Sequence, residues 1–133
     1  MCSAHINESA THIKGDKLLD LSFEFAKKII FLVRSLKEEK ETIISYQLGK
    51  SGTSIGANIN EAQYAQSKAD FVSKLQIALK EANETSYWLK LLFETGYIEE
   101  NVFKELNEAC SRIRVMLITS CKTAKNNMSN DIL

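Results

Sequence analysis

The stretch Leu48–Ala62 reads LGKSGTSIGANINEA and contains three of the five glycines of the chain. A run this rich in small residues is typical of a loop. Apolar residues nevertheless recur through it at intervals of three or four, which is the spacing of one helix face. The residues on this line are Ile44, Leu48, Ser51, Ile55, Ile59 and Ala62. The spacing therefore predicts a helix that runs through the glycines.

A second line, one position after the apolar one, consists of Gly49, Gly52 and Gly56. Each glycine in a helix interior costs about 1 kcal/mol relative to alanine, so three on one line indicate a packing role. Small side chains let another backbone approach closely. We expect these glycines to pack against a sister helix or another subunit. Asn58 lies beside the apolar line, and it either fixes helix register or a subunit contact, or is a surface residue.

Helical spacing continues on both sides of this stretch. Asp16 fits an N-cap, and an apolar line follows it at Leu18, Leu21, Phe25, Ile29, Leu32 and Leu36, widened by Ala26, Ile30 and Val33. After the glycines, Ser67 and Asp70 form the S-x-x-D signature of a helix start. The helix that follows carries Phe71, Leu75, Ala78, Ala82, Thr85, Leu89 and Leu92, and Gly96 suits its C-cap. The last helical line is Phe103, Leu106, Cys110, Ile113, Leu117 and Ser120.

The chain must also turn within residues 38–42, because a single helix from Leu18 to Gln66 would span roughly 70 Å and leave an apolar stripe uncovered. The absence of proline favours long helices. Short connections make consecutive helices antiparallel neighbours. We therefore predict an all-α, up-down-up-down four-helix bundle over residues 16–125. Residues 1–15 are expected to be a flexible tail, and residues 126–133 a frayed end.

Composition narrows the class of protein. Lys and Arg together number 17, as do Asp and Glu, so the formal net charge is zero and gives no support for a nucleic-acid partner. Three scattered cysteines suit a reducing cytosol, and Cys110 and Cys121 fall on an apolar helical pattern that predicts core positions. No apolar stretch is long enough for a membrane span or suited to a signal peptide. We expect a cytoplasmic protein with no membrane contact.

Motifs for catalysis are missing. The histidines are His5 and His12, both in the expected tail, so the folded part lacks the usual base for nucleophilic catalysis and the Glu-x-x-His pairs of a di-iron bundle. The GKSG run at 49–52 lacks the upstream glycine and strand of a phosphate loop, and an all-α chain does not suit a KH module. The sequence predicts no enzyme activity, no metal and no cofactor.

Positive charge concentrates near the C-terminus. Arg112, Arg114, Lys122 and Lys125 lie in a segment without a single acidic residue. Bases near a helix C-terminus complement the helix dipole, which explains much of this pattern. The alternative is a basic surface that contacts phosphate.

The segments SGTSIGANINEA, SKADFVSKLQIALKEANETSYWL and ETGYI resemble the four-helix bundle proteins encoded in intervening sequences of bacterial large-subunit ribosomal RNA genes. This family includes the accessory variability determinant of diversity-generating retroelements. The resemblance covers about Leu18 to Lys125, and its most specific parts are Ser54-Ile55, Asn58-Ile59, Glu61 and the IALKEANET run.

The resemblance implies a protomer that assembles into a ring-like homopentamer without enzymatic activity. In the retroelement branch the pentamer is basic and binds nucleic acid and a reverse transcriptase. This chain departs from that pattern, because its net charge is zero and Gly49-Lys50 stands where family members often carry paired basic residues. Lys50 is the residue carried over at that place.

Two hypotheses follow. The first is a non-catalytic oligomer that associates with RNA or DNA, or with a nucleic-acid enzyme, through Lys50 and the basic residues near the C-terminus. The second is a protein–protein scaffold without direct nucleic-acid contact, which suits the neutral net charge and the glycine line.

Overall fold

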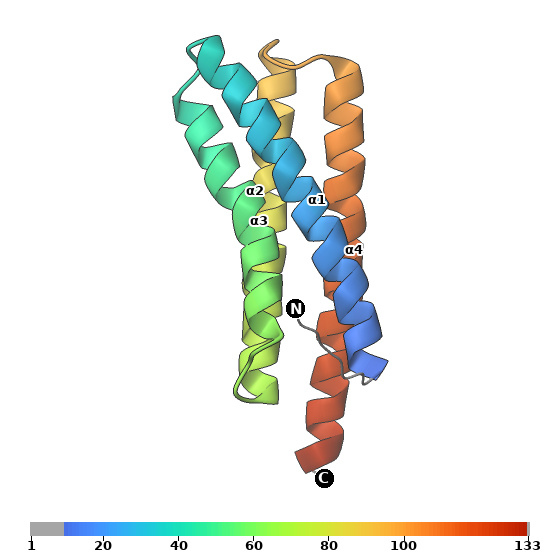
Figure 1. Cartoon of the computed structure of the whole chain (residues 1–133). Helices are drawn as coiled ribbons and strands as arrows, with labels where there is room; N and C mark the ends of the chain where they lie inside the picture. The colour runs from blue at the N-terminus through green and yellow to red at the C-terminus, as the bar shows by residue number, and fades with distance from the viewer. Residues whose placement is uncertain (1–9, 133) are drawn as a thin grey trace.

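The computed structural model describes the backbone of residues 10–132 and the side chains of residues 17–129. It contains four helices, α1 (Ala10–Glu38), α2 (Ile43–Ala62), α3 (Lys68–Glu94) and α4 (Glu100–Ile132). Consecutive helices run in opposite directions, and α1 crosses the bundle diagonally, lying near α2 at one end and near α4 at the other (Figure 1). No strand occurs in the described part of the chain. The predicted all-α four-helix bundle is confirmed.

The outer ends of the first and last helices differ from the expected ones. α1 begins at Ala10 rather than after Asp16, and α4 continues to Ile132 rather than ending near Lys125. A single glycine, Gly15, costs a helix only about 1 kcal/mol, and the sequence has no proline at either place to stop a helix. Residues 1–9 and 133 of the two expected tails lie outside the described residues.

The predicted turn between the first two helices falls at residues 39–42, between Glu38 and Ile43. Lys40 occupies the left-handed region there, with φ 65°. The Glu41 carboxylate accepts hydrogen bonds from the backbone N–H groups of Ile44 and Ser45, at 3.1 and 2.7 Å. These N–H groups have no partner inside the helix, so Glu41 takes the place of an N-cap side chain.

The other two predicted helix signals are confirmed. The backbone N–H of Asp70 donates to Ser67 Oγ at 3.0 Å, so Ser67 is the N-cap of α3. Gly96 lies one residue beyond the C-cap of α3, which is Thr95, and its φ of +85° is a conformation that favours glycine. The two signals mark the start and the end of α3, the longer of the two helices that have a connection at both ends.

The core contains the residues on the inward lines of all four helices. Leu48, Ile55 and Ile59 of α2 are fully buried, which places the glycine-rich stretch inside the bundle as a helix. Cys110 and Cys121 are core residues, as the pattern predicts. Ile30 is an exception, since it was expected to widen the inward face of α1 but is 44% exposed. It lies on the outer edge of α1, because α1 contacts only two neighbours and its inward face is narrower than its apolar stripe.

Candidate functional surfaces

The glycine line of α2 lies against α1 of the same chain. A Cβ built on Gly52 would be 2.9 Å from Ile29 Cγ2, closer than real Cβ contacts allow. At Gly56 it would meet the Ser22 hydroxyl oxygen at 3.3 Å and the Ser22 carbonyl oxygen at 3.4 Å. The facing pairs are Gly49–Val33, Gly52–Ile29 and Gly56–Ser22. Of the two packing partners considered from the sequence, the structure places a sister helix at these glycines.

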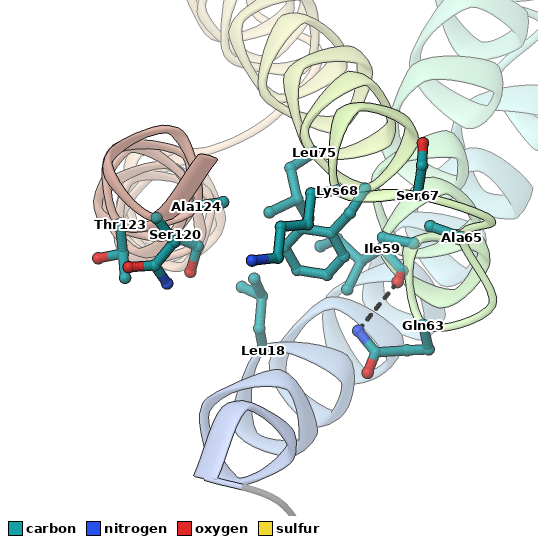
Figure 2. A pocket seen from close by; sticks show the side chains of 13 residues that line it. Leu18, Ile59, Gln63, Ala65, Ser67, Lys68, Leu75, Ser120, Thr123 and Ala124 are labelled. Carbon is teal, nitrogen blue, oxygen red and sulfur yellow. Dashed lines mark hydrogen bonds between the residues drawn. The ribbon is translucent and has the colours of Figure 1, made fainter. Parts of the chain in front are cut away.

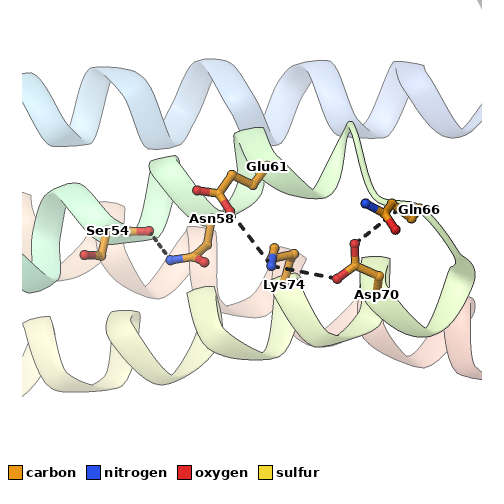
Figure 3. A network of polar contacts seen from close by, with 6 residues as sticks. All are labelled: Ser54, Asn58, Glu61, Gln66, Asp70 and Lys74. Atoms are coloured by element: carbon orange, nitrogen blue, oxygen red, sulfur yellow. Dashed lines mark hydrogen bonds and ion pairs between the residues drawn. The ribbon is translucent and has the colours of Figure 1, made fainter.

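Asn58 lies on the other side of α2, along its seam with α3. Its amide nitrogen donates to the Ser54 carbonyl oxygen at 2.9 Å, within its own helix (Figure 3). Nearby, the Lys74 ammonium lies 3.9 Å from a Glu61 carboxylate oxygen and 3.8 Å from one of Asp70. Half-exposed ion pairs of this length contribute about 0–1 kcal/mol each. The seam therefore joins α2 to the first turns of α3 and holds no arrangement suited to catalysis.

The four basic residues near the C-terminus all lie on α4. Arg112, Lys122 and Lys125 are exposed, and Arg114 is half-buried, with its Nη2 donating to Ser111 Oγ at 3.0 Å. Residues 114, 122 and 125 share one side of the helix, because 100° per residue places them within about 80° of one another. We call Arg114, Lys122 and Lys125 the α4 basic stripe. Arg112 points to a different side of α4.

The α4 basic stripe carries positive charge that the described residues do not neutralise. Within residues 17–129, none of its members nor Arg112 forms an ion pair, whereas four lysines elsewhere do. Those lysines are Lys27, Lys28, Lys74 and Lys104. A cation without a carboxylate partner keeps its full attraction for a phosphate.

Lys50 does not lie near the α4 basic stripe. It is exposed on α2, and α2 and α4 occupy opposite corners of the bundle without touching in the described part of the chain. Its charge acts on the carboxyl group of Glu81 in α3. Burial raises the pKa of the Glu81 carboxyl, as does the neighbouring Glu84, while Lys80 and Lys50 oppose the shift. The charge of Lys50 therefore favours the ionised form of the Glu81 carboxyl.

The structure reveals a further surface on α1, which we call the α1 ridge. It consists of Phe23, Lys27, Ile30, Phe31 and Arg34, with Phe23 65% and Phe31 61% exposed. The Lys27 ammonium lies 5.4 Å from the centre of the Phe23 ring, and the Arg34 guanidinium carbon lies 5.6 Å from that of Phe31. Exposed large apolar side chains in a group mark an interaction surface. The sequence held a signal for it, because both phenylalanines lie off the apolar line of α1.

Groups with catalytic or metal-binding potential are sparse. Within the residues searched, no cluster of three His, Cys, Asp or Glu side chains could hold a metal ion. Burial raises the pKa of the Cys110 thiol to about 11, so it is not a nucleophile near neutral pH. None of the described helices is both long and apolar enough to span a membrane.

The fold is an all-α four-helix bundle, with a basic stripe on α4 and an exposed aromatic ridge on α1. The sequence model of the 23S rRNA-intervening sequence protein family matches residues 16–119. The chain belongs to this family, so the resemblance seen in the glycine-rich stretch and α3 is confirmed at that level. Among curated proteins, none matches.

One solved structure supports the same assignment. It is the crystal structure of a protein of unknown function from the S23 ribosomal protein family of Bacteroides thetaiotaomicron. The two sequences are 50% identical, the match covers 82% of this chain and 98% of the other, and the TM-score is 0.80. The structural likeness thus extends over nearly the whole of that protein.

Proposed function

We propose that the protein is a non-catalytic homo-oligomer that associates with RNA or DNA, or with an enzyme acting on nucleic acid. The observation that carries the proposal is the α4 basic stripe, whose members form no ion pair with the side chains of residues 17–129. A reverse transcriptase is the enzyme partner that the resemblance to the retroelement proteins implies. The family description, which names the 23S rRNA, supports a nucleic-acid context.

The α4 basic stripe suits a phosphate backbone better than a compact ligand. Arg114 and Lys125 are eleven residues apart, which corresponds to roughly 16 Å along the helix. Extended basic rows bind nucleic acid through release of counterions, independently of base sequence. Lys50, on the opposite corner of the bundle, provides a separate contact.

A triple substitution tests this surface. Arg114→Gln, Lys122→Gln and Lys125→Gln together should weaken binding to a structured RNA and to duplex DNA, measured by mobility shift and fluorescence anisotropy over a salt series. The magnitude of the slope of log affinity against log salt should fall by about 3 on duplex DNA, because each lost phosphate contact removes about 0.9. A charge-matched control replaces the exposed lysines Lys17, Lys37 and Lys90 by glutamine and should bind like the wild type.

Absence of binding by the wild type at low salt would end the nucleic-acid proposal. The scaffold function, which suits the neutral net charge, would then take its place. Partners captured from cells would in that case survive nuclease treatment.

The oligomer is proposed to form through the α1 ridge. The glycine line cannot serve this purpose, since α1 already covers it. A ring requires two different complementary patches, so the α1 ridge would contact another face of the neighbouring protomer. The homopentamer implied by the resemblance has a mass of about 75 kDa, five times the 15.0 kDa of one chain.

Light scattering on the purified protein measures this mass directly. Phe23→Ser with Phe31→Ser should produce monomers that remain folded, because both side chains are exposed within the protomer. Tyr64→Ser, at an exposed aromatic residue in the connection between α2 and α3, is the matched control and should leave the oligomer intact. A wild-type mass of 15.0 kDa would exclude any assembly.

A further inference from the structure

A cavity of about 380 Å³ opens at the end of the bundle where α2 turns into α3. Its floor consists of Leu18, Ile59 and Leu75, which are core side chains from three helices. Figure 2 shows these side chains converging on the cavity, with α4 forming the opposite wall. The volume lies at the lower end of the roughly 300–1,000 Å³ found for small-molecule sites.

Small side chains keep this cavity open. Ala62 ends α2, and Ser120 and Ala124 stand one turn apart on α4, where the cavity wall needs large residues to close it. Protein interiors are normally packed almost without voids. An apolar floor beneath a wall of small residues therefore provides space that the side chains of residues 17–129 do not fill.

The mouth of the cavity is polar and carries a positive charge. Gln63, Thr123 and Asn127 contribute amides and a hydroxyl. Among the lining residues that the structure describes, the ionisable one is Lys68, whose side chain reaches across the cavity toward Leu18 (Figure 2). Lys68 has an interaction partner of its own, but an ammonium group has three donors and can hold a carboxylate in addition.

We propose that this cavity binds a small amphiphile with an unbranched apolar chain and a single carboxylate, such as a medium-chain fatty acid. The apolar chain occupies the floor formed by Leu18, Ile59 and Leu75. The carboxylate lies at the mouth, within reach of the Lys68 ammonium and the polar rim. This site is distinct from the α4 basic stripe and from the α1 ridge.

Titration of the full chain with decanoate tests the proposal by calorimetry and by methyl NMR spectra. Decanoate should bind with one site per chain and shift the methyl signals of Leu18, Ile59 and Leu75. Ala124→Phe, which fills the cavity, should weaken binding about tenfold or more. Ala69→Phe, at an exposed position of α3 outside the lining, is the matched control and should bind normally.

The head group is tested separately. Lys68→Gln should weaken decanoate binding about tenfold and leave decanol binding unchanged, while Lys90→Gln should change neither. Ser120→Leu replaces Ala124→Phe if the latter does not fold by circular dichroism. The proposal is overturned if the wild type does not bind decanoate at millimolar concentration, if cavity-filling variants bind equally well, or if the shifted methyl signals lie elsewhere.

Discussion

The hydroxyl oxygens of Ser51 in α2 and Thr85 in α3 lie 2.9 Å apart inside the bundle, and both residues are buried. Each hydroxyl also has a carbonyl oxygen within reach on its own helix. Thr85 Oγ1 lies 2.8 Å from the Glu81 carbonyl oxygen, and Ser51 Oγ lies 3.4 Å from that of Leu48. The pair is thus a satisfied polar contact in an apolar core, and it favours one register of α2 on α3.

We expect this pair to couple energetically. Thr85→Val and Ser51→Ala should each lower the free energy of unfolding by about 1 kcal/mol, because each removes a buried hydrogen bond. The double variant should lose less than the sum, with a coupling of about 0.5–1 kcal/mol in urea unfolding. Ser54→Ala, whose hydroxyl bonds only to its own helix at Lys50, serves as the control. Strictly additive losses would contradict the coupling.

Alanine substitutions at two positions of the glycine line should change the free energy of unfolding in opposite directions. Gly52→Ala should lower the free energy of unfolding by about 1 kcal/mol, because overpacking against the fully buried Ile29 outweighs the gain in helix propensity. Gly49→Ala should raise it by about 0.5–1 kcal/mol, since its Cβ would lie 3.4 Å from the half-buried Val33. Thermal or urea unfolding measures both. Stabilisation by both variants would rule out the close approach of α1.

The residues with positive φ that follow α1 and α3 should respond to substitution with opposite changes in the free energy of unfolding. Lys40 (φ 65°) is a non-glycine residue in the place that Gly96 (φ +85°) occupies at the end of α3. Each position closes its helix through the same pair of backbone bonds, which are Lys40–Lys37 and Glu41–Leu36 at one end and Gly96–Phe93 and Tyr97–Leu92 at the other. Lys40→Gly should raise the free energy of unfolding by about 1 kcal/mol, and Gly96→Ala should lower it by a similar amount.

Such a result would show that the two turns obey the same backbone constraint. Differential scanning calorimetry detects both changes as shifts of Tm. Lys37→Gly, inside the last turn of α1, is a control that should destabilise the protein, since glycine there disrupts regular helix. A destabilising Lys40→Gly would mean that the lysine side chain outweighs the strain of its backbone.

The buried thiol of Cys110 leads us to expect a loss of stability at high pH. Burial raises the pKa of its thiol from 9.0 to about 11, against the opposing charge of Arg114. The folded state therefore holds the thiol proton more tightly than the unfolded state. The stabilisation is complete below about pH 9 and is lost as pH rises toward about 11, by roughly 2 kcal/mol.

Unfolding free energies of the wild type and of Cys110→Ala measure this contribution. The difference between them should be constant from pH 7 to pH 8 and should fall between about pH 9 and about pH 11. Lysine and tyrosine ionisation affects both proteins alike and cancels in the difference. Parallel pH profiles up to pH 11 would show that the thiol is not protected by burial.

Much of the fold was predictable because helix signals are local. The N-cap at Ser67, the cap at Gly96 and the apolar line through Leu48 and Ile55 each depend on neighbours within one or two turns, and the structure has all of them. The start of α1 was not predictable with equal accuracy, because a lone Gly15 is a weak stop signal. The α1 ridge was not predicted, because Ile30 was expected to widen the inward face of α1 and the width of a buried helix face is known only when its neighbours are placed.

The sequence by itself determined that Leu48–Ala62 is a helix and that its glycines need a close neighbour. Only the tertiary structure decided that this neighbour is α1, and that α2 and α4 lie at opposite corners, which separates Lys50 from the α4 basic stripe. Helical periodicity follows from the 3.6-residue repeat of a single segment. The choice of neighbours depends on how four segments pack around one core, so it is a property of the whole chain.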